Sequence, residues 1–212
     1  YEIHERLVGS EMCIRDRHYT SIENIHKVID PLFLDDLKKE FKEIQAVTVR
    51  RTKEKRLDEF QNKLASLTFL DPACGSGNFL TETYLSLRRL ENEVIRERVG
   101  GQITLGEVHN PIKVSIQQFY GIEINDFAVT VAKTALWIAE SQMLEETKNI
   151  VYGFNDDFLP LKTYVNITEG NALRIDWNEV VPVERLSYIM GNPPFVGYSY
   201  QSESQKKDIE NV

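Results

Sequence analysis

The stretch DPACGSGNF, residues 71–79, joins two segments of different periodicity. Before it stands a short apolar run, LTFL at residues 67–70, which predicts a buried strand. After it, apolar residues recur at helical spacing and predict a long amphipathic helix: Phe79, Leu80, Tyr84, Leu87, Leu90 and Val94. Gly75 and Gly77 lie in the turn between, where residues without a side chain let the backbone pass close to a bound nucleoside. The sequence therefore predicts a strand, a glycine turn and a helix.

The same plan recurs downstream and indicates the fold class. A second strand is predicted at residues 119–124, and the helix after it, from about Phe127, carries Val131, Ala135, Ile138 and Ala139 on one face. Further strand candidates are residues 164–168 and 186–190. Strands that alternate with helices favour an α/β fold with a doubly wound parallel sheet, in which ligands bind at the C-terminal ends of the strands.

The segment ahead of the glycine turn is predicted to be helical. Ser21 is the expected N-cap of a helix, and Asp30-Pro31 interrupts the apolar spacing, so two short helices are expected, with the apolar positions Ile22, Ile25, Val28, Ile29, Leu34, Leu37, Phe41 and Ile44. Residues 48–63 are rich in Lys, Arg and Glu around a thin apolar stripe of Leu57, Phe60 and Leu64. Because acids are interleaved with the bases, a solvated helix face is a better interpretation of this segment than a DNA-binding patch.

Three segments are expected along the chain. Residues 1–17 join neither periodic pattern, and their LVGSEMCIRDR run resembles translated adapter sequence, so they are interpreted as a non-native or disordered leader. Residues 18–66 form the helical segment, and residues 67–212 form the sheet domain, which is expected to be incomplete. Residues 100–115 contain glycines and the run His109-Asn110-Pro111, so an insertion of irregular structure is expected there.

Composition narrows the class of protein. With 25 Lys and Arg against 33 Asp and Glu, the net charge of −8 has the wrong sign for a chain whose whole surface grips phosphates. The only thiols are Cys13 and Cys74, so a disulfide framework or a zinc site with several cysteines cannot be built, and no metal is predicted. No stretch approaches the roughly 20 apolar residues of a membrane span, and the start of the sequence lacks the charged, apolar and cleavable regions of a secretory signal, so a cytoplasmic protein without a membrane partner is expected.

Two polar residues follow predicted strands at the edge where a ligand would bind. Glu123 ends the second strand, where a carboxylate can accept hydrogen bonds from both hydroxyls of a ribose, although with Asp126 it could simply start the next helix. Asn171 follows the third strand and could meet an adenine edge or only stabilise a turn. The glycine turn could likewise serve only packing, and Leu80 stands where a dinucleotide fingerprint has its third glycine, which disfavours an NAD site.

The run NPPF, residues 192–195, carries the chemistry that we predict. An exocyclic amine on adenine is a poor nucleophile because its lone pair is delocalised into the ring, so acceptors must be aimed at its two hydrogens. The Asn192 carboxamide oxygen and the Pro193 carbonyl can accept them, Pro194 helps to fix the backbone, and Phe195 offers a face for stacking a flipped base. The alternative is a turn with an aromatic residue packed beneath it.

Five motifs taken together resemble the amino-methylating DNA methyltransferases. They are HYTS at 18–21, DPACGSGNF at 71–79, GIEIN at 121–125, GNAL at 170–173 and NPPF at 192–195, and the resemblance covers essentially all of residues 18–200. Their order is similar to the gamma arrangement of adenine methyltransferases, and the chain resembles most the MmeI-like, type II restriction-modification family. The resemblance implies a Rossmann-like S-adenosylmethionine-dependent methyltransferase fold.

The resemblance also implies residue roles. Tyr19 and Thr20 would cover the methionine or sulfonium side of S-adenosyl-L-methionine, Glu123 would hold its ribose and Asn171 would meet its adenine, while the cofactor would be lined by Asp71, Ala73, Gly75, Gly77, Phe79 and Ile124. Many relatives have aspartate at the position of Asn171, which changes the hydrogen bonds that the side chain can offer. Asn192, Pro193, Pro194 and Phe195 would act on the target base.

The implied function is transfer of a methyl group to adenine N6 in double-stranded DNA, with the target adenine flipped out, as part of a restriction-modification system. Because the chain stops soon after NPPF and has no upstream nuclease motif, it is expected to be a catalytic fragment, inactive alone, whose recognition domain lies in a missing C-terminal part. Three alternatives remain open: methylation of a protein glutamine amide, methylation of guanine N2 in RNA, and a non-catalytic nucleotide-binding module.

Overall fold

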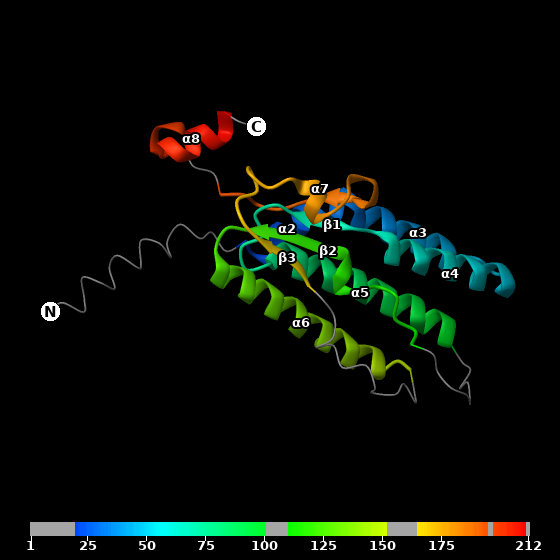
Figure 1. Cartoon of the computed structure of the whole chain (residues 1–212). Helices are drawn as coiled ribbons and strands as arrows, with labels where there is room; N and C mark the ends of the chain where they lie inside the picture. The colour runs from blue at the N-terminus through cyan, green and yellow to red at the C-terminus, as the bar shows by residue number, and fades with distance from the viewer. Residues whose placement is uncertain (1–19, 101–109, 152–164, 195–196, 211–212) are drawn as a thin grey trace.

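The computed structural model describes residues 20–100, 110–151, 165–194 and 197–210 (Figure 1). Its four strands are β1 (Phe69–Asp71), β2 (Phe119–Glu123), β3 (Asn166–Glu169) and β4 (Tyr188–Ile189). The α-helices are α2 (Ile22–Ile29), α3 (Asp35–Gln45), α4 (Arg50–Ser66), α5 (Asn78–Val99), α6 (Asp126–Lys148), α7 (Trp177–Val180) and α8 (Glu203–Glu210). A π-helix, η1 (Asp30–Leu34), and the 3-10 turns η2 (Ile116–Gln118), η4 (Val183–Arg185) and η5 (Tyr198–Tyr200) complete the described elements.

The strands form one parallel sheet in the order β3-β2-β1-β4. The chain therefore moves outward from β1 to β3 and then crosses to the other side of β1, where Phe69 pairs with Tyr188 and Leu70 with Ile189. The α/β fold with a parallel sheet and a helical N-terminal segment is confirmed. The strand order thus reverses at β1, and in a parallel sheet of this kind ligands bind where the strand order reverses.

The strands and long helices lie close to their predicted positions. β1 begins two residues later than the apolar run, whose first residue, Leu67, is the C-cap of α4, and β4 is shorter than the candidate at 186–190. The third strand candidate begins at Tyr164, which lies outside the described residues, and β3 itself runs from Asn166 to Glu169. Of the expected irregular insertion, residues 110–115 form neither helix nor strand.

The N-terminal helices differ from prediction at one junction. The Ser21 hydroxyl accepts a hydrogen bond from the amide of Asn24 at 3.4 Å, so Ser21 caps α2 as predicted. Two separate helices were expected around Asp30-Pro31, but the helical backbone runs without a break from Ile22 to Gln45. Pro31 has no N–H to donate, and the backbone widens into η1, in which the amide of Asp35 donates to the carbonyl of Asp30. The two predicted helices are therefore confirmed as α2 and α3, and the interruption at Asp30-Pro31 takes the form of a π-helical turn rather than a loop.

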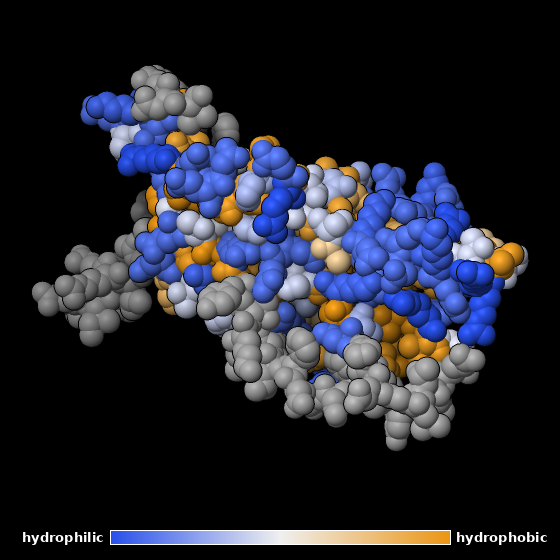
Figure 2. All heavy atoms as spheres, turned by 45° about the vertical axis from the view of Figure 1, so that its right-hand side comes forward, coloured by the Kyte–Doolittle hydropathy of each residue, from blue (hydrophilic) through white to orange (hydrophobic). Residues whose placement is uncertain are grey.

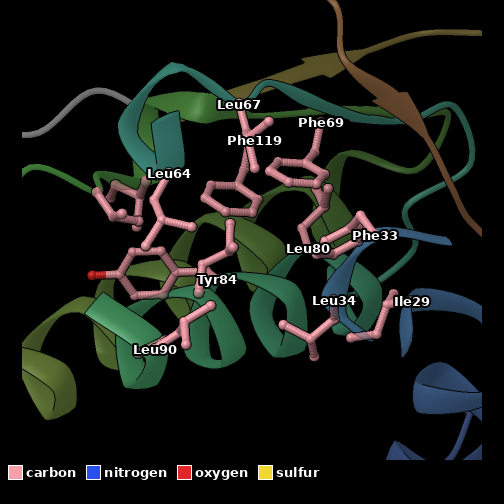
Figure 3. Packing of buried hydrophobic residues seen from close by; sticks show 14 of the residues in the cluster. Ile29, Phe33, Leu34, Leu64, Leu67, Phe69, Leu80, Tyr84, Leu90 and Phe119 are labelled. Carbon is pink, nitrogen blue, oxygen red and sulfur yellow. The ribbon is translucent and has the colours of Figure 1, made fainter. Parts of the chain in front are cut away.

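One hydrophobic core holds these helices against the sheet (Figure 3). The ring centroid of Phe33 in η1 lies 5.1 Å from that of Phe69 in β1 and 5.1 Å from that of Tyr188 in β4. Phe69 stacks on Phe119 of β2 at 5.1 Å, and Tyr84 of α5 meets Phe119 edge-on. This aromatic cluster fixes the helices on one face of three neighbouring strands.

The opposite face of the sheet carries a smaller cluster. Leu70, Ile122 and Val181 are buried there with partly buried residues of α7 and the loops around it. Phe69 and Leu70, which are adjacent in sequence, belong to different clusters, because successive side chains of a strand point to opposite faces. The sheet therefore has apolar cover on both sides.

Helix α4 is charged, and several of its cations lie in ion pairs. Lys53 lies 2.7 Å from Glu97 of α5, and Lys63 lies 2.6 Å from Glu40 of α3. Leu57, Phe60 and Leu64 form its buried stripe. Hydrophilic residues predominate on the face shown in Figure 2. These pairs support the interpretation of a solvated helix face. Across the described ranges, no helix is both long and apolar enough to cross a membrane.

Candidate functional site

The glycine turn lies at the C-terminal end of β1, between that strand and α5. Gly75 and Gly77 have φ angles of +54° and +80°, a left-handed conformation that glycine adopts without strain. The amide of Gly77 donates to the carbonyl of Cys74 at 2.8 Å, and a Cβ at Gly77 would stand 3.0 Å from that of Ala132 in α6. The turn therefore needs glycine at Gly77 both for its conformation and for helix packing.

Glu123 ties the turn to the end of β2. One of its carboxylate oxygens, Oε2, accepts from the amide of Gly75 at 2.9 Å, and Oε1 accepts from the amide of Asn125 at 2.9 Å. The N-cap of α6 is Asn125, whose Oδ1 accepts from Ala128, and Asp126 lies in the first turn. Asn125 and Asp126, rather than Glu123, thus occupy the start of α6. The half-buried carboxylate of Glu123 faces the glycine turn instead.

Asp71 is a buried carboxyl at the end of β1, with 2% of the residue exposed. Its Oδ1 accepts from the amide of Ala73 at 3.0 Å. Burial raises the pKa of Asp71 to about 7, and the nearby charge of Glu123 adds to the increase, while the Ala73 hydrogen bond opposes it. The same burial raises the pKa of the Cys74 thiol, so that thiol is unreactive at neutral pH.

The NPPF loop begins directly beside Asp71. The amide of Met190 donates to the carbonyl of Leu70 at 2.9 Å, which continues the pairing of β1 with β4. A Cβ built on Gly191 would stand 2.4 Å from Oδ1 of Asp71, so only glycine allows the backbone this approach. The carbonyl ends of β1 and β4 therefore bring the glycine turn and the NPPF loop to one place.

The N-terminal motif reaches the same loop. Nδ2 of Asn192 donates to Oγ1 of Thr20 at 3.2 Å, across 172 residues of sequence. Asn192, Pro193 and Pro194 are exposed. Tyr19, which was predicted to cover the cofactor with Thr20, and Phe195, which was predicted to stack on the target base, lie outside the described residues.

Asn171 is occupied by hydrogen bonds within the protein. Its Oδ1 accepts from the amide of Leu173 at 3.0 Å, which is the turn-stabilising role considered for it. Its Nδ2 donates to Oδ2 of Asp208 in α8 at 3.0 Å, and Arg174 donates to the same carboxylate from Nε at 2.8 Å. The hydrogen bond from Arg174 lowers the pKa of Asp208.

Two other predicted cofactor residues differ in exposure. Ile124, after β2, is 69% exposed, and its neighbour Phe127 is 68% exposed. Phe79 instead lies in the hydrophobic core with 4% exposure, so only its backbone can border a ligand. Phe127 carried no predicted role, because in the sequence it reads only as the first residue of an amphipathic helix.

Sequence reasoning assigned no role to Gly191, Arg174 or Asp208. Gly191 directly precedes NPPF in the sequence, but a larger residue at this position is excluded by Asp71, which is distant in sequence. Arg174 and Asp208 stand in polar segments without a motif. Within the part of the chain that the structure describes, no group of three or more His, Cys, Asp or Glu residues could hold a metal ion.

The assembled site combines a glycine turn, two carboxylates and an exposed asparagine-proline loop at one end of the sheet. Residues 47–212 match the family model described as "MmeI, DNA-methyltransferase domain". The chain is also similar to DNA methyltransferase A of Bacillus subtilis (strain 168), with 44% identity over 92% of the chain and 21% of that protein. It is similar to the adenine-specific methyltransferase PglX of Streptomyces coelicolor, with 34% identity over 34% of the chain and 5% of that protein.

A solved structure agrees over most of the chain. The type IIL restriction-modification enzyme MmeI, solved in complex with DNA, superposes with a TM-score of 0.82 and 43% identity over 92% of this chain and 25% of its own. The chain thus spans about a fifth to a quarter of the length of the two relatives that cover most of it.

Proposed function

The chain belongs to the family of MmeI DNA-methyltransferase domains, and we propose that the protein containing it transfers a methyl group from S-adenosylmethionine to N6 of adenine in DNA. The observation that carries the proposal is the meeting of three motifs at the end of β1. Gly191 approaches Asp71, and Asn192 donates to Thr20, so the NPPF loop, the glycine turn and the N-terminal motif form a single site.

The residues around the glycine turn fit the proposed cofactor. S-adenosylmethionine carries a ribose with two hydroxyls, an ammonium group and a sulfonium, and when bound it supplies an activated methyl group. Glu123 would accept from the ribose hydroxyls, since each of its oxygens already accepts one backbone amide and retains a further lone pair. Asp71 provides a second carboxyl for the cationic end, and glycine at Gly75, Gly77 and Gly191 keeps the backbone close to both.

Ile124 and Phe127 extend this fit to an apolar surface. Both are more than two-thirds exposed at the end of β2, next to Glu123. An adenine ring attached to a ribose held by Glu123 would find an apolar side chain there. We propose Ile124 as the residue against which that ring packs. The contact of Asn171 with adenine is proposed only through its remaining amide hydrogen and its backbone, because its side chain also bonds Leu173 and Asp208.

The NPPF loop supplies the chemistry at the target amine. Asn192 would accept one hydrogen of the amine through Oδ1, and the Pro193 carbonyl would accept the other, which favours a tetrahedral nitrogen with its lone pair free to attack. Pro193 and Pro194 fix the backbone, so the two acceptors keep their geometry. Phe195 would stack on the flipped base. Positioning and charge stabilisation thus replace a strong base.

Membership of this family supports DNA rather than protein or RNA as the substrate. By analogy with MmeI, we propose that the complete protein belongs to a restriction-modification system and that another part of it reads the DNA sequence. The net charge of −8 is consistent with a main DNA grip outside these residues. The name of the Streptomyces relative, an adenine-specific methyltransferase, supports adenine as the target.

Substrate comparison tests this proposal. The complete protein would be incubated with labelled S-adenosylmethionine in three parallel reactions. They would contain mixed-sequence duplex DNA, structured RNA or a glutamine-containing protein. We expect label in DNA alone. Label in RNA or protein but not in DNA would overturn the substrate. Calorimetry with S-adenosylmethionine, NAD and ATP is the second measurement, and failure to bind S-adenosylmethionine would favour a non-catalytic module.

A further inference from the structure

A hydrogen bond to Thr20 holds the side chain of Asn192. The amide nitrogen points to Thr20, with Nδ2 and Oγ1 3.2 Å apart. Among the residues that the structure describes, none donates a hydrogen bond to Oδ1 of Asn192. The oxygen of the carboxamide is therefore the end left open to a substrate.

Orientation matters because the two ends of a carboxamide have opposite hydrogen-bonding character. The oxygen only accepts and the nitrogen only donates, and the terminal torsion of asparagine has two broad wells of similar energy. Rotated by half a turn, Asn192 would present its NH2 to the amine of the target base. Two donors would then face each other, and the amine hydrogen would lose its acceptor.

Thr20 is held in place by the helix that follows it. Ser21 caps α2, and the amide of Ile25 donates to the carbonyl of Ser21 at 3.0 Å. Ile25 and Ile29 are buried in the core. The hydroxyl of Thr20 is thus attached to a helix whose first turn is hydrogen-bonded and whose inner face is fixed.

A polar contact docks the same helix on α5. Nε2 of His26 lies 3.1 Å from Oε1 of Glu82, and Nδ1 lies 2.8 Å from Oδ1 of Asp30. Since α5 starts at the glycine turn, α5 contacts α2 and also carries the cofactor side of the site. Thr20 therefore directly precedes a helix that packs on the same element as the glycine turn.

We propose that Thr20 is a positioning residue for the reaction: its hydroxyl holds the Asn192 side chain by accepting from Nδ2, in the orientation that leaves Oδ1 for the target amine. The hydroxyl could also donate to Oδ1 of a rotated carboxamide, but only the observed orientation presents an acceptor to the hydrogens of the amine. The inference rests on the proposed function. It assigns Thr20 a role toward the target base, whereas the family resemblance implies only a role in covering the cofactor.

Substitutions at Thr20 in the complete protein separate these roles. Thr20→Val keeps the shape and removes the acceptor, and Thr20→Ser keeps the acceptor. We expect Thr20→Val to lower the methylation rate at saturating cofactor by about tenfold, the effect of one lost hydrogen bond at the upper end of its usual strength. The Kd of S-adenosylmethionine should change by less than about twofold, since the Thr20 hydroxyl acts on Asn192 rather than on the cofactor. Thr20→Ser should restore the rate, and Thr48→Val, at an exposed threonine, should leave it unchanged.

Three results would overturn the inference. They are an unchanged rate in Thr20→Val, a loss confined to cofactor affinity, and failure of Thr20→Ser to restore the rate. Each is read against a wild-type protein that methylates adenine. A wild-type protein with no such activity instead refutes the proposed function, and the two failures are thereby distinguished.

Discussion

Asp71 should make the stability of the protein fall as the pH rises through neutrality. In an unfolded chain its carboxyl would titrate near the ordinary value of 3.8, but burial raises the pKa to about 7 in the folded state. The folded protein therefore holds the proton more tightly than the unfolded chain does. Its stability is unaffected by this group below pH 3.8, falls as the pH rises, and levels off above pH 7.

The size of the effect follows from the shift. The two pKa values differ by about three units at about 1.4 kcal/mol each, so the ionised carboxyl costs the folded state about 4 kcal/mol above neutrality. Between pH 5 and pH 8 the loss should be about 3 kcal/mol, because part of the change lies below that window. For a chain of about 200 residues this corresponds to roughly 6–12 °C in Tm.

Asp71→Asn removes the titrating group while keeping the shape of the side chain. Thermal unfolding of the wild type and the variant between pH 5 and pH 8, without cofactor, should give curves that diverge by about 3 kcal/mol, with the variant the more stable at pH 8. His26, whose pKa is raised mainly by Asp30, loses its contribution as the pH rises in both proteins, so it cancels in the difference.

Asp208→Asn serves as the control for this experiment. Arg174 lowers the pKa of Asp208 from 3.8, so this group titrates below the window and its variant should run parallel to the wild type. Parallel curves for Asp71→Asn and the wild type from pH 5 to pH 8 would refute the account of Asp71 as a buried carboxyl with a raised pKa.

Three further substitutions test other parts of the structure. Gly191→Ala would put a Cβ 2.4 Å from Oδ1 of Asp71 and should lower the free energy of unfolding by about 1–3 kcal/mol in urea denaturation. Gly197→Ala, where the nearest atom is 3.7 Å from the added Cβ, should cost much less, and equal costs would contradict the close approach. Glu91→Ala would leave buried Arg88 without its carboxylate and should cost about 3–5 kcal/mol, whereas Glu93→Ala, at an exposed site on the same helix, should cost little. Glu123→Gln should weaken S-adenosylmethionine binding by about 10- to 100-fold in calorimetry, because charge-assisted hydrogen bonds to the ribose are lost. The control is Glu169→Gln, which changes an exposed carboxylate at the end of β3. An equal effect of the two substitutions would argue against the ribose role of Glu123.

Local patterns predicted most of the fold. The apolar run before Gly75 and the helical spacing after Gly77 correspond to β1 and α5, and the repeat of that plan corresponds to β2 and α6. These elements follow from residues that are close in sequence, and the parallel sheet follows from their alternation. The order β3-β2-β1-β4 then placed the NPPF loop beside the glycine turn, as the doubly wound arrangement predicts.

The remaining features depend on residues that are distant in sequence. The π-helix at Asp30–Leu34 follows from Pro31, but whether a proline breaks or widens a helix depends on the packing of Phe33 and Leu34. The contact of Asn171 with Asp208 spans 37 residues and joins two segments without periodicity. The requirement for glycine at Gly191 appears only once β4 lies against Asp71. No local pattern in the sequence encodes these contacts.

The central claim is that Asn192 acts on adenine N6, and nucleoside analysis of methylated DNA tests it most directly. The complete protein and its Asn192→Ala variant would each be incubated with duplex DNA and a saturating concentration of S-adenosylmethionine. The DNA would then be digested and its nucleosides identified by mass spectrometry. We predict N6-methyl-2′-deoxyadenosine from the wild type, with a rate reduced at least about 100-fold in the variant. Equal amounts of N6-methyl-2′-deoxyadenosine from both proteins, or a methyl group on another base, would contradict the claim.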